Sequence, residues 1–321
     1  MATWSAQLTA LASRSRQATQ PAQGLERRPK VPDLISLIIT TYNREDALDA
    51  VLSALSRQSD HGFEVVVADD GSRPLTAAVV ERWRPLLGVP LGHVWQINTG
   101  FRAAEIRNRA ILVCRGDYCV FLDGDCIAPA DFVAAHRKLA ERGWFVTGNR
   151  VLLSPTLTAA VLRDDPRPEG WSAPGWFRQR LRGGVNRLAA VLRLPLGPLR
   201  KLRSRQWRGA RSCNLAVWRS DLERVDGFDA CFSGWGREDS DLLIRLLRCG
   251  LRRKDGRFAT GVIHLWHPQV DRAQLAANDA RLDAVLHSDC IRAQRGLSAL
   301  REAAVAGEND RQNDHHVRAQ S

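Results

Sequence analysis

Short apolar runs alternate with amphipathic segments along the first half of the chain. The first run, residues 34–41, is nearly continuous, which is typical of a parallel strand covered on both faces. Similar runs follow at 63–68, 93–97 and 118–122, and segments of helical periodicity separate them. Because strand and helix alternate three times before residue 123, the pattern predicts an α/β fold with a doubly wound, mostly parallel sheet.

Two carboxylates follow the strand predicted at 118–122. Asp123 and Asp125 flank Gly124 where that strand ends, and ligands bind at the carboxyl ends of strands in open α/β sheets. Two acids this close repel each other unless a cation or hydrogen-bond donors neutralise them. Carboxylate oxygens suit Mg²⁺ or Mn²⁺, which often bring substrate phosphates with them. Taken alone, the triplet is explained equally well by a solvated turn.

The charge balance of the chain indicates an anionic partner. Its 321 residues include 47 Lys and Arg against 35 Asp and Glu, for a net charge of +12. Nucleic acid, a phospholipid surface and a phosphorylated substrate all fit this balance. No RNA-binding module is recognisable, so nucleic acid is not expected as a partner.

The sequence gives no sign of export or of a membrane span. No run of 18 or more apolar residues occurs, and the N-terminus lacks the pattern of a signal peptide. The seven cysteines are odd in number and form no Cys-x-x-Cys pair, as expected for reduced thiols in a cytosolic protein without zinc. We therefore expect a cytoplasmic protein, with the inner face of the cell membrane as a peripheral location.

Four short motifs occur in a fixed order along the predicted sheet. They are residues 39–44 (Ile-Thr-Thr-Tyr-Asn-Arg), 68–72 (Ala-Asp-Asp-Gly-Ser), 100–108 (Gly-Phe-Arg-Ala-Ala-Glu-Ile-Arg-Asn) and 123–125 (Asp-Gly-Asp). Their order and spacing resemble those of family 2 glycosyltransferases of the GT-A fold. The resemblance implies that the first two motifs hold the uridine of a nucleotide sugar, that Asp123 faces the ribose or sugar, and that Asp125 binds a metal ion.

The same resemblance implies roles for individual side chains. Thr40 and Tyr42 would contact the base, and Asp70 would accept a hydrogen bond from it. The nucleotide-sugar contacts implied in this way are Thr40, Tyr42, Arg44, Asp70, Arg102, Arg107, Asn108 and Asp123. For Arg107, a second interpretation stays open, namely an arginine on the exposed face of a helix.

A second group of chemistry-bearing residues lies at 235–239, Trp-Gly-Arg-Glu-Asp. Acids in the first turn of a helix are favoured by its dipole, but capping does not explain a tryptophan between two glycines. The stretch resembles the Trp-Gly-Gly-Glu-Asp acceptor motif of β-1,4-galactosyltransferases and several bacterial family 2 enzymes, with Arg237 in place of the second glycine. The resemblance implies that Trp235, Gly236 and Glu238 bind the acceptor and that Asp239 is the catalytic base.

Two histidines three positions apart, His264 and His267, lie in residues 262–268, where a further strand is predicted to end. In related enzymes a histidine from this position completes the metal shell, so the resemblance implies that His264, His267 or both bind Mn²⁺ or Mg²⁺ with Asp125. A packed core histidine is the alternative for either residue. The resemblance covers residues 34–270.

The region between the two motif groups is unusually basic. Phe177, Leu181, Val185, Leu188 and Leu192 are spaced as one helical stripe, flanked by Arg178, Arg180, Arg182 and Arg187 and interrupted by Gly183-Gly184. A basic amphipathic helix over 176–193 could lie on an anionic membrane surface or form a lid packed on the enzyme itself. The two interpretations stay open.

These features divide the chain into five predicted parts: a loosely packed N-terminus (1–33), a nucleotide-sugar-binding subdomain (34–150), the basic insertion (151–205), an acceptor-binding catalytic subdomain (206–300) and a flexible tail (301–321). The predicted function is a metal-dependent inverting glycosyltransferase that moves a sugar from a UDP-sugar, of galactose or N-acetylhexosamine type, to a saccharide or lipid-linked saccharide. The product would be a β-glycoside. The alternatives are a nucleotidyltransferase acting on a sugar phosphate and a non-catalytic anion-binding protein.

Overall fold

A computed structural model of the chain describes residues 31–269 and 271–306. The predicted loose N-terminus lies outside this part except for residues 31–33, and so does the predicted tail from residue 307 onward. Residues 297–306 are helical, so the prediction of a flexible tail beginning at 301 is wrong for its first six residues.

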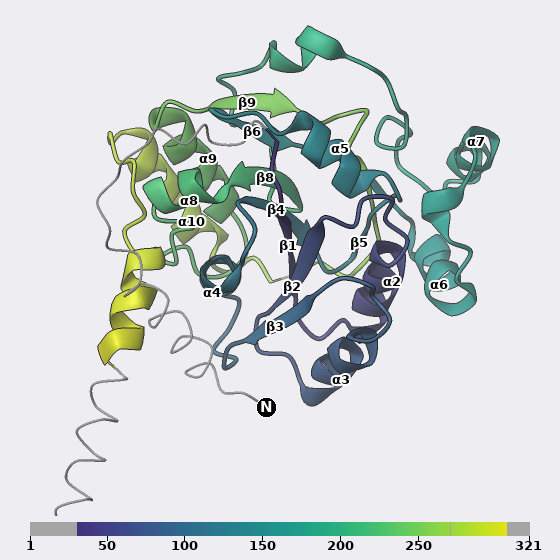
Figure 1. The fold of residues 1–321 in the computed structure, drawn as a ribbon, viewed down its shortest axis with the longest axis horizontal. Helices are drawn as coiled ribbons and strands as arrows, with labels where there is room; N and C mark the ends of the chain where they lie inside the picture. The colour runs from purple at the N-terminus through teal and green to yellow at the C-terminus, as the bar shows by residue number, and fades with distance from the viewer. Residues whose placement is uncertain (1–30, 270, 307–321) are drawn as a thin grey trace, which may run out of the picture.

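A seven-stranded sheet with the order β3-β2-β1-β4-β8-β6-β9 forms the centre of the molecule (Figure 1). The strands are β1 (Ile35–Thr41), β2 (Phe63–Asp69), β3 (Leu91–Trp95), β4 (Tyr118–Asp123), β6 (Trp144–Thr147), β8 (Asn214–Trp218) and β9 (Arg252–Asp255). All neighbouring pairs are parallel except those of β8, which runs antiparallel to both β4 and β6. The predicted mostly parallel sheet is confirmed.

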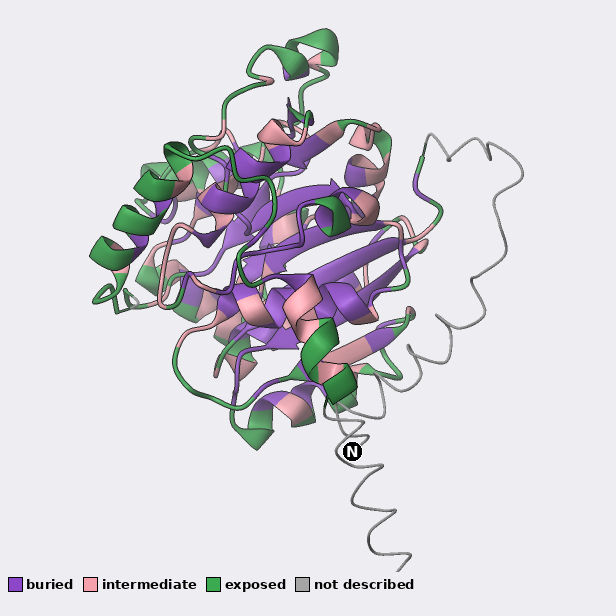
Figure 2. Cartoon of the chain, turned by 90° about the vertical axis from the view of Figure 1, so that its left-hand side faces the viewer, coloured by how far each residue is buried: buried purple, intermediate pink, exposed green. Residues whose placement is uncertain are grey.

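Two apolar cores cover the two faces of this sheet. Alternate residues of β4 point to opposite sides: Val120 and Leu122 join one core, and Phe121 joins the other. The first face is covered by α2 (Glu45–Leu55), α3 (Pro74–Trp83) and α5 (Phe132–Leu139), and the second by α4 (Ala103–Val113), α8 (Arg219–Arg224) and α9 (Glu238–Arg248). The strands are accordingly buried between layers of partly exposed helices (Figure 2).

A small second sheet forms one wall of the candidate site. It contains β5 (Cys126–Ile127), β10 (Val262–His264) and β7 (Arg150–Leu152), in the order β5-β10-β7. In its register His264 lies opposite Cys126, one residue after Asp125. Because β8 to β10 come from the predicted acceptor subdomain and pair with strands of the nucleotide subdomain, the two predicted subdomains share both sheets.

The basic insertion folds differently from its predicted long helix. It contains α6 (Pro155–Asp164), the 3₁₀ turns η1 (Pro168–Gly170) and η2 (Gly197–Lys201), and α7 (Ala173–Leu181). Helix α7 ends at Leu181 because Gly183 adopts φ +72°, after which Val185 is buried and forms an isolated β-bridge with Leu153. The prediction of one amphipathic stripe through residue 192 is therefore wrong. Among the described helices, none has the length and apolarity required to cross a bilayer.

Helix α4 is attached to the segment before the acceptor motif by one asparagine. Asn108 is fully buried; its Nδ2 donates to the carbonyl of Phe228 at 2.7 Å, and its Oδ1 accepts from the Phe228 amide at 2.8 Å. Gly227, at φ +73°, leaves no room for a Cβ beside this amide group. The side chain is thus fully engaged in the protein interior, and the structure does not support the predicted nucleotide contact of Asn108.

We predict that Asn108→Ala lowers the free energy of unfolding by about 2–4 kcal/mol, because it removes two buried hydrogen bonds and leaves both backbone groups of Phe228 without partners. Urea denaturation would measure the change. Asn186→Ala is the control: its Oδ1 accepts one hydrogen bond, from the Leu152 amide at 3.0 Å, at an exposed position where water can replace it, so the change should cost less than about 1 kcal/mol. An equal loss of unfolding free energy in the two variants would contradict the structural role given to the Asn108 hydrogen bonds.

Candidate active site

The two carboxylates of the Asp-Gly-Asp motif emerge where β4 ends beside β1. The amide of Gly124 donates to the Thr40 carbonyl at 2.8 Å, so the turn lies directly on the neighbouring strand. A Cβ at Gly124 would come within 2.9 Å of Thr41 Cβ, which explains the need for glycine here. This contact directs Asp123 and Asp125 to the carboxyl edge of the sheet, where the sequence predicted them.

A single buried guanidinium joins the two predicted halves of the site. Arg107 of α4 donates from Nε to Thr40 Oγ1 at 3.0 Å and from Nη1 to Glu238 Oε1 at 3.0 Å. Its Nη2 lies 3.4 Å from Asp123 Oδ1. The residue is only 4% exposed, which excludes the alternative of a surface arginine. The side chain therefore bridges β1, β4 and the N-terminus of α9.

Burial and neighbouring charges shift the pKa values of the carboxylates around Arg107. Burial raises the pKa of Glu238, the Asp239 carboxylate raises it further, and the Arg107 guanidinium opposes both. Burial likewise raises the pKa of Asp123, where Arg107 counteracts burial and the neighbouring Asp125 adds to it. Glu238 Oε2 is buried and has no hydrogen-bond partner among the described residues. That oxygen is available to accept from a hydroxyl group of a bound ligand.

The acceptor motif forms a rigid loop ahead of α9. Gly234, Gly236 and Arg237 all have positive φ, at +74°, +103° and +81°. Arg237 thus keeps a left-handed conformation that glycine adopts more easily, at a cost of about 1–2 kcal/mol. Its guanidinium pairs with Asp279 of α10 (Leu275–Leu286), which anchors the strained residue. Arg237 therefore occupies a backbone conformation that suits the glycine of the motif it resembles.

A residue that the sequence analysis missed supports this loop from below. Asn278 of α10 is almost fully buried and donates from Nδ2 to the carbonyls of Ser233 and Gly236, at 2.9 and 3.0 Å. Trp235 has the guanidinium of Arg272 4.8 Å from its ring centre. No sequence signal pointed to Asn278, because its partners are more than 40 residues away.

Asp239 lies in the first turn of α9, where the helix dipole favours a negative charge. Its Oδ1 accepts from the amide of Ser240 at 2.7 Å, and no described residue bonds to its Oδ2. The Asp239 carboxylate is close enough to Arg107 and Asp123 to affect the pKa of both, after the larger effect of burial. Glu238 therefore lies across Arg107 from Asp123, and Asp239 lies beside it.

The predicted base-binding residues gather around the segment after β3. The carboxylate of Asp70 accepts from the amide of Arg102 at 2.7 Å and from the side chain of Gln96, while burial raises its pKa. Tyr42 is half exposed, and its hydroxyl accepts from Asn98 Nδ2 at 2.9 Å. Gln96 and Asn98 are thus further residues of this region that sequence reasoning missed.

The arginines predicted to contact the nucleotide are also held by protein partners. Arg102 donates to the carbonyl of Ile97 and lies 3.3 Å from Glu105. Arg44 pairs with Asp46 at 3.1 Å and has an exposed side chain fraction of 28%. Both guanidiniums would have to exchange or share these partners to reach a nucleotide.

Three predicted metal ligands meet at the edge of the small sheet. Asp125 Oδ1 lies 3.6 Å from His264 Nε2, and Asp125 Oδ2 lies 3.5 Å from His267 Nε2. Ligand atoms bound to one ion at roughly 2.1 Å lie about 3.0–3.5 Å apart, so the spacing fits with little movement. Among the described residues, the group of possible ligands whose atoms all lie within 4.8 Å of one another is Asp125, Cys126 and His264, and His267 is not part of it.

The protonation of His264 also fits a cation. Burial lowers the pKa of His264 to about 4, so this ring is neutral at neutral pH. His267 Nδ1 lies 2.6 Å from the Pro268 carbonyl, which can only accept, so Nδ1 carries a proton and Nε2 is the nitrogen directed toward Asp125. The donor set of one carboxylate and imidazoles suits Mn²⁺ or Mg²⁺, with the imidazoles favouring the former.

Comparison with known sequence families identifies two regions of the chain. Residues 36–187 match glycosyl transferase family 2, and residues 200–268 match the N-terminal domain of galactosyltransferase. The chain belongs to glycosyltransferase family 2. The first match contains Asp123 and Asp125, and the second contains Glu238 to His267. The candidate site is therefore built from both matched regions.

Relatives of this family 2 chain include a glucosyltransferase and a chondroitin synthase. It is 30% identical over 249 residues to validoxylamine A glucosyltransferase of Streptomyces hygroscopicus subsp. limoneus, covering 71% of this chain and 51% of that protein. It is 28% identical to chondroitin synthase of Pasteurella multocida, covering 70% of this chain and 24% of the synthase. The family 2 chain thus spans about half or less of these relatives.

Solved structures confirm the fold of the family 2 chain. A mannosyltransferase from Pyrobaculum calidifontis, in complex with GDP-Man and Mn²⁺, superposes with a TM-score of 0.54 at 19% identity, covering 87% of this chain and 72% of that one. GalNAc-T7 with UDP, GalNAc and Mn²⁺ gives 0.53 at 16% identity, covering 75% and 45%. The fold is GT-A, as the sequence motifs indicated.

We predict that His264→Ala and His267→Ala each weaken Mn²⁺ binding tenfold or more, because each removes one ligand of the proposed shell. A Mn²⁺ titration followed by electron paramagnetic resonance, in the presence of UDP, would measure it. His287→Ala, at an exposed histidine of another surface, is the control. A lower melting temperature with unchanged Mn²⁺ affinity would instead identify packed core histidines.

We also predict that Arg107→Met destabilises the fold by about 3–5 kcal/mol at pH 7, because Glu238 and Asp123 lose their buried counter-charge. In the variant both folded-state pKa values rise further above the unfolded ones, so stability is retained at low pH and lost as pH rises through the folded values. The difference from wild type should therefore be smaller at pH 5 than at pH 7.

Urea denaturation at both pH values checks this prediction, with Arg107→Lys as a variant that keeps the charge but not the planar fork. An equal loss at both pH values would mean that Arg107 acts through packing alone.

Proposed function

We propose that the chain is a metal-dependent inverting glycosyltransferase that moves a sugar from a UDP-sugar to a hydroxyl of a saccharide or lipid-linked saccharide. The observation that carries the proposal is the meeting of Asp123 with Glu238 and Asp239 around the buried Arg107, with Asp125 beside Asp123. A nucleotidyltransferase would need the first pair of acids but not the second pair behind a tryptophan loop. A purely anion-binding protein would need neither.

On the donor side, the uridine would bind between Tyr42 and Asp70, with Thr40 at the end of β1. Asp70 would accept from the base N–H, and its lone pairs not used by Gln96 and Arg102 suffice for this. Asp123 would accept from a ribose or sugar hydroxyl. A donor sugar of galactose or N-acetylhexosamine type is proposed because the second family match is to galactosyltransferase and because GalNAc-T7, a fold neighbour, was solved with UDP and GalNAc.

Asp125, His264 and His267 would hold Mn²⁺ or Mg²⁺ against the donor diphosphate. When bound, such an ion supplies Lewis-acid stabilisation of the negative charge on the departing diphosphate. The chain's own contribution is to fix the ligands: β10 places His264 opposite Cys126, and the carbonyl of Pro268 sets the tautomer of His267.

On the acceptor side, Trp235 would stack on a sugar ring, while Glu238 Oε2 would accept a hydrogen bond from one hydroxyl of that sugar. Asp239 would remove the proton from the attacking hydroxyl as its oxygen forms a bond to the anomeric carbon. The bond from that carbon to the diphosphate breaks on the opposite face, UDP leaves, and the configuration inverts. A base in this position typically contributes roughly 10²–10⁴-fold to the rate.

We predict that Asp239→Asn lowers kcat about 10²-fold or more while UDP affinity changes little, because the amide keeps the hydrogen bond from Ser240 but cannot accept the proton. Steady-state rates and UDP titration calorimetry on the same protein would separate the two effects. Asp241→Asn is unsuitable as a control, since Asp241 is buried and paired with Arg245. Asp283→Asn, on the exposed side of α10, is the better control.

The decisive experiment is release of nucleoside diphosphate from a panel of UDP-sugars with Mn²⁺, with and without saccharide acceptors. GDP-mannose belongs in the panel because a fold neighbour was solved with GDP-Man. Turnover with UDP-galactose or a UDP-N-acetylhexosamine that stops in Asp125→Ala supports the proposal. Turnover with GDP-mannose alone, or full turnover in Asp125→Ala, would contradict the donor or the metal assignment respectively.

A further inference from the structure

The positive charge of the chain is concentrated in one segment of the sequence. Eleven of the 47 Lys and Arg residues lie between positions 178 and 211, where no Asp or Glu occurs. The rest of the chain therefore has 36 basic residues against 35 acidic ones and is nearly neutral. The net charge of +12 is thus a local property of this segment and does not describe the surface as a whole.

Exposed apolar side chains gather in the same place. Of the sixteen large apolar residues that are exposed in the described part of the chain, six lie between 177 and 202: Phe177, Leu181, Leu192, Leu194, Leu199 and Leu202. Leu199 is 60% exposed and Leu202 is 76% exposed. Isolated exposed leucines are ordinary, but a cluster surrounded by polar groups marks an interaction surface. We call residues 192–208 the leucine–arginine segment.

Hydrogen bonds and an ion pair hold the leucine–arginine segment against the rest of the protein. Arg200 is almost fully buried and donates to the carbonyls of Asp255 and Arg257, at 2.8 and 2.7 Å, and to Leu194 at 3.1 Å. The amide of Leu194 donates to the Phe258 carbonyl at 3.0 Å, and Arg193 pairs in a bidentate way with Asp131. Between these anchors the chain turns outward through η2, with Leu199 and Leu202 at its surface.

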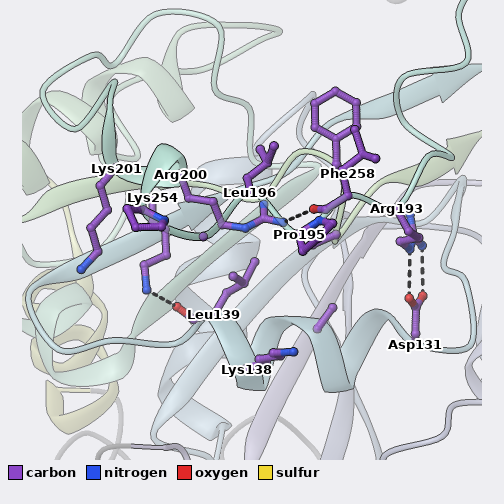
Figure 3. A pocket seen from close by; sticks show the side chains of 15 residues that line it. Asp131, Lys138, Leu139, Arg193, Pro195, Leu196, Arg200, Lys201, Lys254 and Phe258 are labelled. Atoms are coloured by element: carbon purple, nitrogen blue, oxygen red, sulfur yellow. Dashed lines mark hydrogen bonds and ion pairs between the residues drawn. The ribbon is translucent and has the colours of Figure 1, made fainter.

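A hollow of about 690 Å³ lies beneath the segment, between α5 and the turn after β9 (Figure 3). Its floor is apolar, with Leu139, Leu196 and Phe258 among its lining residues, whereas Lys138 and Lys201 contribute positive charge. Of the exposed leucines, Leu194 lines this hollow, whereas Leu199 and Leu202 lie next in sequence to its lining residues Pro198 and Lys201. A segment that exposes both leucines and arginines fits a partner that offers both hydrocarbon and negative charge.

Several arginines of the segment form no ion pair within the described part of the chain. Arg203, Arg205 and Arg208 form no ion pair with any residue in the described ranges, in contrast to Arg193 and Lys201, which pair with Asp131 and Glu141. Arg208 lies against the Trp207 ring, 4.9 Å from its centre. Three unpaired guanidiniums within six positions repel one another, and an anionic surface would relieve that repulsion.

We propose that the leucine–arginine segment docks the protein on an anionic lipid bilayer, with Leu199 and Leu202 entering the interface and Arg203, Arg205 and Arg208 contacting lipid phosphates. A nucleic acid would use the arginines but gives the exposed leucines no role. The position differs from the helix over 176–193 that the sequence suggested, because α7 ends at Leu181 and the longest run of exposed leucines lies beyond residue 190. This proposal is independent of the proposed reaction.

The test is sedimentation of the full chain with phosphatidylcholine vesicles, with and without phosphatidylglycerol, at low salt and without nucleotide or acceptor. Wild-type protein should bind only the anionic vesicles. Arg203→Gln/Arg205→Gln/Arg208→Gln should weaken that binding tenfold or more, and so should Leu199→Ser/Leu202→Ser, which leaves the charge unchanged. Folding of each variant is checked by its melting temperature and by UDP binding.

The matched control is Arg178→Gln/Arg180→Gln/Arg182→Gln, which removes the same charge from α7 and should change binding less than threefold. A larger loss in this control than in the segment variants would overturn the assignment. So would unchanged binding in the leucine variant, or equally tight binding of wild type to neutral vesicles. Tighter binding to single-stranded DNA than to anionic vesicles, unaffected by the leucine changes, would identify nucleic acid as the ligand and also overturn it.

Discussion

The candidate site depends on the neutralisation of neighbouring carboxylates by one buried guanidinium. Arg107 is the charged group that touches β1, β4 and α9 at once, through Thr40, Asp123 and Glu238. Without it, the buried Glu238 and the partly exposed Asp123, both of elevated pKa, would lack their shared counter-charge. The Asp-Gly-Asp turn and the start of α9 are therefore coupled electrostatically.

The topology of the sheets makes this coupling feasible. Strand β8 enters the main sheet antiparallel between β4 and β6, and β10 pairs with β5 just after the Asp-Gly-Asp turn. Residues 92 to 100 positions apart in β4 and β8, and 136 to 138 positions apart in β5 and β10, are thereby joined by backbone hydrogen bonds. The site rests on rigid strands and on one helix N-terminus, a support that restricts the movement of its side chains.

The loop before α9 shows how the protein tolerates a departure from the motif it resembles. Arg237 occupies a left-handed conformation suited to glycine, and its pairing with Asp279 compensates part of the strain. Asn278 fixes the neighbouring carbonyls from the same helix. Helix α10 is therefore a structural support of the acceptor loop, although it contributes no residue to the predicted site. Its role could not be anticipated from the motif alone.

The sequence by itself determined the elements whose signals are local. Apolar runs predicted β1, β2 and β4, because a strand buried on both faces must be apolar along its length. The Asp-Gly-Asp turn and the start of α9 at Glu238 were predicted from strand-end and helix-start chemistry.

The tertiary structure alone decided the properties that depend on distant partners. The Asn108 side chain is hydrogen-bonded to the backbone of Phe228. Arg107 is buried between Thr40 and Glu238. Helix α7 ends at Leu181, and Val185 forms a β-bridge with Leu153. Periodicity records which face of a segment is apolar, but the hydrogen bonds and charges that fix a polar side chain come from residues many positions away.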